Sequence, residues 1–160
     1  SEKIWNVLKD ASPEYGPVMH GFTYSGHPVG GALGLVNIDI LDKEGLVQNS
    51  ADVGAYFLKS LEQAVGDHEF VGNVRGAGLM LAVEYVADKT AKRFFTTPIH
   101  RVVSAKAMEM GLMTRPLPYL EANSFSPPLM MKRSDVDEAV GIFTKALAAA
   151  TPDMAKAAGA

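Results

Sequence analysis

Residues 20–28 read His-Gly-Phe-Thr-Tyr-Ser-Gly-His-Pro, a turn rich in glycine and hydroxyl groups that leads into a segment with helical spacing. Proline suits the first position of a helix, because its fixed φ and missing N–H cost nothing there. A helix that begins directly after such a turn presents free backbone N–H groups and the positive end of its dipole. The stretch therefore predicts either an anion-binding turn or a plain turn whose hydroxyl groups cap the backbone.

The composition restricts the chain to a few classes of protein. Its 160 residues, 48% of them hydrophobic, suffice for one domain with a core, and the formal charge of −3 predicts no surface for nucleic acid. Without cysteine, and without metal-ligand spacing of histidines or carboxylates, we expect neither a disulfide nor a metal site. Since no apolar run reaches membrane-spanning length and no signal peptide is visible, we expect a cytoplasmic protein with no membrane partner.

Hydrophobic periodicity predicts helices that alternate with short strands. The expected helices cover residues 1–8, 28–44, 50–65, 99–110 and 134–147, and the expected strands cover residues 70–74, 79–85, 112–114 and 123–125. Ser50 and Ser134 are the expected N-caps of their helices. Breaker residues predict a loop over residues 10–19, and the alanine-rich tail after Thr151 is expected to fray.

This order of elements predicts an α+β fold, in which helices pack on one face of a small, mainly antiparallel sheet. The first 45 residues contain no predicted strand. In addition, Ile4, Trp5 and Leu8 form an apolar face with no preceding element to cover it. We therefore expect residues 1–45 to belong to a larger domain that is mostly absent, and residues 46–160 to form a small C-terminal domain.

Four motifs resemble, in the same order, landmarks of one enzyme family. They are the turn at residues 20–28, Val-Arg-Gly-Ala-Gly-Leu-Met at 74–80, Gly-Leu-Met-Thr-Arg-Pro at 111–116 and Ser-Pro-Pro-Leu at 126–129. From Lys3 to about Leu147, the chain resembles the class III aminotransferases, the ω-aminotransferase branch of the fold-type I pyridoxal-phosphate enzymes. The resemblance implies that residues 1–45 are the C-terminal edge of the α/β large domain, which binds the cofactor, and that residues 46–160 are the small domain.

The same resemblance implies roles for individual residues. The Thr23 hydroxyl, with adjacent backbone from Phe22, would bind the phosphate of pyridoxal 5'-phosphate held in the neighbouring subunit, which implies at least a homodimer. Arg115 would hold the carboxylate of an amino acid or oxo acid and swing away for an uncharged amine; its other interpretation is a surface arginine in a weak salt bridge. The Schiff-base lysine is expected upstream of Ser1. We therefore expect no catalytic residue in this chain, and no activity from the chain alone.

The implied function is transfer of an amino group from an ω-amino acid or amine to a 2-oxo acid. Two alternatives stay open: another pyridoxal-phosphate enzyme on the same scaffold, such as an aminomutase, and a non-catalytic binding or interaction domain. Outside the implied site, Arg75 is expected to donate structural hydrogen bonds between a strand end and a loop, and Glu84 to pair with a nearby cation. His27 is expected to cap the helix that follows it, whereas His68 and His100 are isolated in the sequence.

Overall fold

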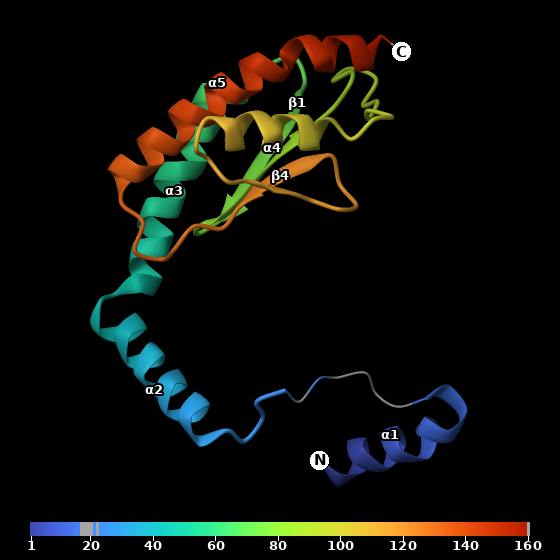
Figure 1. Cartoon of the computed structure of the whole chain (residues 1–160), viewed down its shortest axis with the longest axis vertical. Helices are drawn as coiled ribbons and strands as arrows, with labels where there is room; N and C mark the ends of the chain where they lie inside the picture. Colours follow the sequence, from blue (N-terminus) through green and yellow to red (C-terminus); the bar gives the residue numbers. More distant parts are fainter. Residues whose placement is uncertain (17–20, 22, 160) are drawn as a thin grey trace. The chain divides into compact units, whose positions relative to one another are not determined.

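The computed structural model describes residues 1–16, 21 and 23–159. This part of the chain forms two compact units, Ser1–Asp39 and Ile40–Ala160. Figure 1 shows helices in both units and strands only in the second. The prediction that the first 45 residues contain no strand is therefore confirmed for the residues that the structure describes.

The first unit contains α1 (Glu2–Tyr15) and most of α2 (Pro28–Lys43). α1 is longer than predicted, because it continues through Pro13 and ends at Gly16, where φ is 81°. The loop expected after the first helix thus starts later than the breaker residues indicated. Pro13 removes only its own N–H donor near the end of the helix, and Gly16 N still donates to Ser12 O across 2.9 Å.

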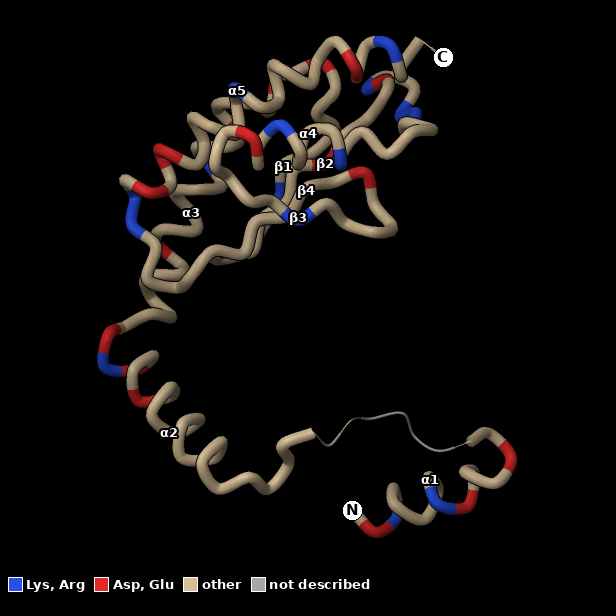
Figure 2. The backbone as a smooth tube through the Cα atoms, in the orientation of Figure 1, with Lys and Arg blue, Asp and Glu red and all other residues tan. Residues whose placement is uncertain are grey.

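Both helices of the first unit carry exposed apolar side chains. Trp5 of α1 is 62% exposed, and α2 exposes both Leu33 and Leu35. These two leucines lie on opposite sides of α2, because two residues correspond to about 200° of helical rotation. Figure 2 shows charged residues only toward the C-terminal end of α2. Neither helix has a buried residue in the described chain, and a helix that is apolar all round is typical of one surrounded by protein.

The second unit combines a four-stranded sheet with three further helices. In spatial order the strands are β1 (Val71–Ala77), β2 (Met80–Tyr85), β4 (Ala122–Phe125) and β3 (Arg115–Pro116), and each neighbouring pair is antiparallel. The helices are α3 (Leu46–Val65), α4 (Ile99–Glu109) and α5 (Arg133–Ala158) (Figure 1). The predicted α+β fold with a small antiparallel sheet is confirmed. None of the described helices is both long and apolar enough to cross a bilayer.

The core lies between one face of the sheet and the helices. Leu81, Val83 and Tyr85 of β2 are buried, whereas Met80 between them and the turn is exposed, so β2 alternates as predicted. Phe125 of β4 connects the layers by edge-to-face contacts with one ring from α3 and one from α5. The ring centroids lie 5.5 Å and 5.0 Å from it. The opposite face of the sheet carries Arg75 and Arg115.

Two predicted helix caps are wrong. α3 begins after Gly45, whose φ of 61° is left-handed, and not at Ser50. The Ser50 hydroxyl instead accepts a hydrogen bond from Leu79 N across 3.2 Å. α5 begins after Lys132 and not at Ser134. The Asp135 carboxylate accepts a hydrogen bond from the Lys132 backbone N–H at 2.9 Å, in place of the cap expected from Ser134.

The C-terminal tail also differs from the prediction. Instead of fraying after Thr151, α5 continues through Pro152 to Ala158. Ala150 and Met154 are fully buried against the rest of the second unit. Burial of these apolar side chains stabilises the last turns more than the alanine-rich composition alone would indicate.

Candidate functional site

Thr23 lies in a turn that leads directly into α2. The turn covers residues 23–26, with left-handed backbone at Tyr24 (φ 65°) and Gly26 (φ 73°), and His27 N donates to Tyr24 O across 3.1 Å. A glycine at the second of these positions avoids the strain that a side chain would meet. Phe22, which was expected to act beside Thr23, lies outside the described residues.

His27 caps α2, as predicted. Its Nδ1 accepts a hydrogen bond from Gly30 N across 3.2 Å, while its backbone carbonyl accepts from Gly31 N. An amide of the first helical turn is therefore already satisfied by the chain itself. The Thr23 hydroxyl, in contrast, is exposed and forms no hydrogen bond to any described residue. With the exposed hydroxyls of Tyr24 and Ser25, it is one of the groups of this turn that remain available to bind a ligand.

Arg115 is the first of the two residues of β3, at an edge of the sheet. The strand predicted just before it is wrong: Leu112 N donates to Ala107 O and completes the end of α4, and regular pairing begins only at Arg115, opposite Ser124. Side chains directly opposite each other share a face of the sheet. Arg115 therefore lies on the open face, in one row with Ser124, Ala82 and Arg75.

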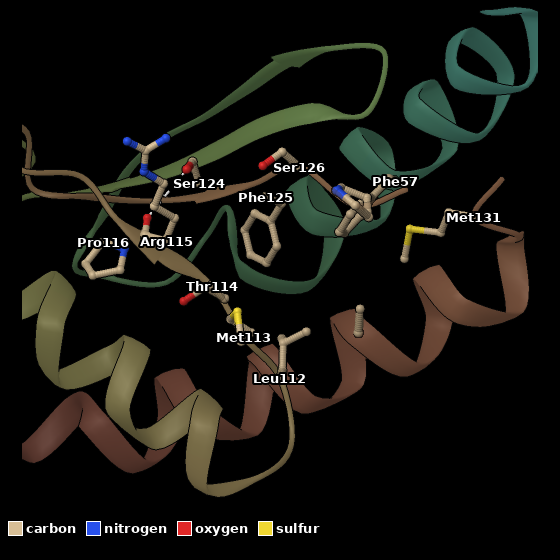
Figure 3. Close-up of a pocket in the computed structure, with 12 residues that line it drawn as sticks. Phe57, Leu112, Met113, Thr114, Arg115, Pro116, Ser124, Phe125, Ser126 and Met131 are labelled. Atoms are coloured by element: carbon tan, nitrogen blue, oxygen red, sulfur yellow. Dashed lines mark hydrogen bonds between the residues drawn. The ribbon is translucent and has the colours of Figure 1, made fainter. Parts of the chain in front are cut away.

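The guanidinium of Arg115 is exposed and forms no ion pair with any residue that the structure describes. Figure 3 shows that it extends past Ser124, away from Leu112 and Met131. The alternative interpretation, a surface arginine held in a salt bridge, has no support in this part of the chain. A free guanidinium with parallel N–H donors is well suited to bind a carboxylate in a bidentate manner.

Two hollows meet at Arg115. One, of about 450 Å³, lies on the helix side and is mostly apolar, with Phe57, Leu112 and Met131 among its lining residues (Figure 3). The other, of about 570 Å³, lies over the open face of the sheet between Arg75 and Arg115. Both include the exposed Ser126 after β4, which begins one of the four family motifs but was given no role from the sequence. Arg115 thus stands between two hollows that are both mostly apolar.

Arg75 is a structural residue. Its guanidinium lies 2.8 Å from the Glu84 carboxylate on the adjacent strand, and it also donates to Asn73 Oδ1 at 3.2 Å. The predicted pairing of Glu84 with a cation is confirmed, although Arg75 lies within β1 and not at its end. Since Arg75 is engaged in this way, Arg115 is the unpaired cation of the row.

Among the described residues, neither a lysine nor a metal-ligand cluster contributes to the two hollows at Arg115. Neither hollow beside Arg115 is lined by a lysine. Elsewhere, Lys89 Nζ donates to Gly66 O, and Lys106 pairs with Glu109 at the surface. The described residues contain no cluster of histidines and carboxylates that could hold a metal ion. Placement of the Schiff-base lysine outside these residues stays a prediction.

A buried histidine was also missed. His100, at the start of α4, has its Nδ1 2.9 Å from Glu121 Oε1, although the two groups are not aligned as a hydrogen bond. Its backbone N–H donates to the second oxygen of Glu121 across 3.4 Å. Glu121 therefore links the helix to the loop after β3, a contact that 21 residues of separation hide from the sequence pattern.

Comparison with known proteins identifies the family. Residues 1–147 match the family described as Aminotransferase class-III. The chain belongs to this family. Class III aminotransferases use pyridoxal 5'-phosphate, and the exposed Thr23 hydroxyl fits one of the donors that a phosphate needs. No described residue of the turn supplies a lysine or arginine, so the turn forms at most part of a phosphate site.

Individual relatives agree with this assignment. Diaminobutyrate–2-oxoglutarate transaminase of Halomonas elongata is 43% identical over 141 residues, which are 87% of this chain and 30% of that protein. A structure from directed evolution of transaminases by ancestral reconstruction has a TM-score of 0.79 and 44% identity, over 96% of this chain and 34% of its own. The ω-transaminase of Pseudomonas jessenii in complex with PMP has a TM-score of 0.77 and 35% identity, over 94% of this chain and 33% of its own. The class III aminotransferase chain thus spans about a third of the length of these relatives.

Proposed function

We propose that the complete protein is a pyridoxal-phosphate-dependent aminotransferase that transfers an amino group from an ω-amino acid or amine to a 2-oxo acid. In this proposal residues 1–45 belong to the cofactor-binding large domain, and residues 46–160 form the small domain. The Schiff-base lysine lies outside residues 1–160. Family membership over residues 1–147 supports the reaction class, and the name of the Halomonas elongata relative includes 2-oxoglutarate, which is a 2-oxo acid.

One observation carries the assignment of a substrate site: the unpaired guanidinium of Arg115 between two hollows. Amino acids and 2-oxo acids both carry a carboxylate, and a guanidinium binds that group with two parallel hydrogen bonds. A long side chain on an exposed edge strand can also move aside when the substrate is an uncharged amine. Arg115 therefore binds and orients the substrate through its carboxylate.

Thr23 contributes to the cofactor site of the partner subunit in this proposal. Its exposed hydroxyl donates to the phosphate, and a homodimer brings this turn to the other subunit's cofactor. When bound, pyridoxal phosphate supplies the electron-withdrawing ring on which the amino group is transferred. The turn residues only hold the phosphate, and they take no part in moving protons.

The experiment that tests the proposal replaces Arg115 in the complete protein. Two amino donors of equal chain length, 4-aminobutyrate and butylamine, differ in the carboxylate alone. We expect Arg115→Ala to lower kcat/KM for 4-aminobutyrate by roughly 10- to 100-fold, the size of one lost charged hydrogen-bond pair, with little change for butylamine. Arg101→Ala is the matched control, because Arg101 is exposed on α4 and lines neither hollow.

The cofactor-bound protein is reacted with each donor in the absence of a 2-oxo acid, because an acceptor would also present a carboxylate to Arg115. The second-order rate constant of this single half-reaction then serves as kcat/KM for the donor. An equal loss of kcat/KM for both donors would contradict the carboxylate role. Absence of any amino transfer by the complete wild-type protein would overturn the proposed reaction itself.

A further inference from the structure

The short strand that carries Arg115 is anchored by hydrogen bonds of the buried residue that precedes it. β3 contains only Arg115 and Pro116, and proline has no N–H to contribute to the sheet. Two paired residues at an edge form too short a ladder to fix a side-chain direction. The residue before the strand, Thr114, is instead buried and hydrogen-bonded on both sides.

Thr114 belongs to a chain of four polar side chains. Tyr85 O–H donates to Asn123 Oδ1 at 2.7 Å, and Asn123 Nδ2 donates to Thr114 Oγ1 at 3.2 Å. The Thr114 hydroxyl then donates to Ser104 Oγ at 3.1 Å. Tyr85 and Asn123 are fully buried, so this chain connects β2, β4 and α4 through the interior of the second unit.

The direction of these hydrogen bonds is fixed. Burial raises the pKa of Tyr85 well above its ordinary value, with a smaller contribution from the Glu121 carboxylate, so the phenol remains a donor. A donor at this end makes the Asn123 oxygen the acceptor and turns its amide nitrogen toward Thr114. Each later hydroxyl then has one proton to donate, and every member of the chain has at least one hydrogen-bond partner.

The last bond of the chain acts on the backbone next to Arg115. Ser104 Oγ donates to the carbonyl oxygen of Thr114 across 3.1 Å. That carbonyl belongs to the peptide unit that joins Thr114 to Arg115, and a peptide unit is planar. Holding this plane restrains the direction in which the Arg115 side chain leaves the strand, on the face opposite to the buried Thr114 side chain.

We propose that Thr114, with Asn123 and Ser104, is a positioning residue that sets the direction of the Arg115 guanidinium and thereby the strength with which a substrate carboxylate is bound. Asn123 and Ser104 line neither hollow, and Thr114 lines only the one on the helix side. This inference rests on the proposed carboxylate role of Arg115. A carboxylate bound by two parallel hydrogen bonds depends on the angle of the guanidinium, whereas an uncharged amine does not use it.

Thr114→Val in the complete protein is the main test, because valine has nearly the same shape and lacks the hydroxyl. Ser104→Ala is a second variant, which removes the bond to the Thr114 carbonyl at a half-buried position. Thr114→Ser keeps the hydroxyl. Thr144→Val is the matched control, since the Thr144 hydroxyl donates only to Val140 O in its own helix.

We expect Thr114→Val and Ser104→Ala to raise KM for 4-aminobutyrate by about threefold to tenfold, with kcat and the KM for butylamine unchanged. The dissociation constant of glutarate, a dicarboxylate that cannot react, should rise by a similar factor in calorimetry. For Thr114→Ser and for Thr144→Val, we expect the KM for 4-aminobutyrate and the dissociation constant of glutarate to stay at the wild-type level.

The Arg115→Ala background separates the two proposals. If Thr114 acts through Arg115, then adding Thr114→Val to Arg115→Ala changes KM for 4-aminobutyrate no further. A selective effect of Arg115→Ala without one of Thr114→Val would overturn the positioning role and leave the proposed function intact. If Arg115→Ala itself has no selective effect, the carboxylate site is wrong and the positioning role falls with it.

Discussion

Gly54 of α3 and Gly78 of the β1–β2 turn are in backbone contact: a Cβ atom on Gly54 would overlap the carbonyl group of Gly78. Gly78 begins a two-residue turn, since Ala77 pairs with Met80, and its φ is 53°. Glycine adopts such a left-handed conformation at little cost. α3 therefore crosses the end of the hairpin at a distance that only glycine in the helix allows.

Gly54→Ala should destabilise the second unit. The methyl group meets backbone atoms of Gly78, which cannot move away as a flexible side chain would. We expect a loss of about 2 kcal/mol or more in the free energy of unfolding, typical of overpacking in a rigid place. Urea denaturation followed by circular dichroism measures this loss.

Gly141→Ala is the control for that prediction. Gly141 lies in α5, and a Cβ there meets no atom within 4 Å. Alanine should therefore stabilise the helix by roughly 0.5–1 kcal/mol relative to glycine. If both variants changed the free energy of unfolding in the same direction, the close contact between α3 and the hairpin turn would be contradicted.

The parts of the fold that follow from short-range patterns were predictable. Alternation in β2 indicated which of its side chains are buried. Gly45 and Gly111 directly follow the predicted ends of two helices, and both have the positive φ that is typical of a glycine at such a position. His27 was expected to cap α2 because it directly precedes Pro28. In each case the physical cause lies within a few residues of its effect.

The wrong predictions lie where a contact with a distant segment of the chain determines the local structure. Ser50 has the chemistry of an N-cap, but its hydroxyl accepts from Leu79 N, 29 residues away. The helical tail is stabilised by burial of Met154, which a local pattern does not reveal. Tertiary contacts override intrinsic preference in both cases.

Only part of the candidate site was predicted from the sequence. Sequence motifs indicated Thr23 and Arg115, and the structure describes both of them as exposed and unpaired within the described chain. The hydrogen bonds beneath Arg115 were not predicted, because Tyr85 and Asn123 are 38 residues apart. The available signal was Asn123 itself, a polar residue at the start of the predicted strand, since a buried amide requires partners.

Thr23→Ala in the complete protein should weaken retention of pyridoxal phosphate. The exposed hydroxyl is free to donate to a phosphate, and loss of a hydrogen bond to a charged group should raise the dissociation constant of the cofactor by roughly tenfold or more. Dialysis followed by absorbance of the released cofactor measures the change. Thr23→Ser keeps the donor and should bind nearly as well as the wild type; equal retention by all three proteins would contradict the phosphate role.

His68 should make the stability of the second unit depend on pH. Its Nδ1 accepts from Phe70 N at 3.2 Å, and its Nε2 lies 3.0 Å from the Thr151 hydroxyl. Because that hydroxyl donates its proton to Leu147 O at 2.9 Å, it accepts from Nε2–H of a neutral ring. A proton added at Nδ1 would face the N–H of Phe70, so protonation breaks this arrangement.

Burial lowers the pKa of His68 below its ordinary value of 6.5; Glu69 opposes this shift and Lys89 adds to it. The unfolded chain therefore binds a proton at a higher pH than the folded chain does. The stabilisation is complete above about pH 6.5 and is lost as the pH falls toward the lowered pKa. Urea midpoints between pH 7.5 and 5.5 should decrease, and His68→Gln should flatten the decrease because glutamine does not titrate. Since other groups titrate equally in both proteins, the difference between the two profiles isolates His68, and parallel profiles would show that its neutral ring does not stabilise the fold.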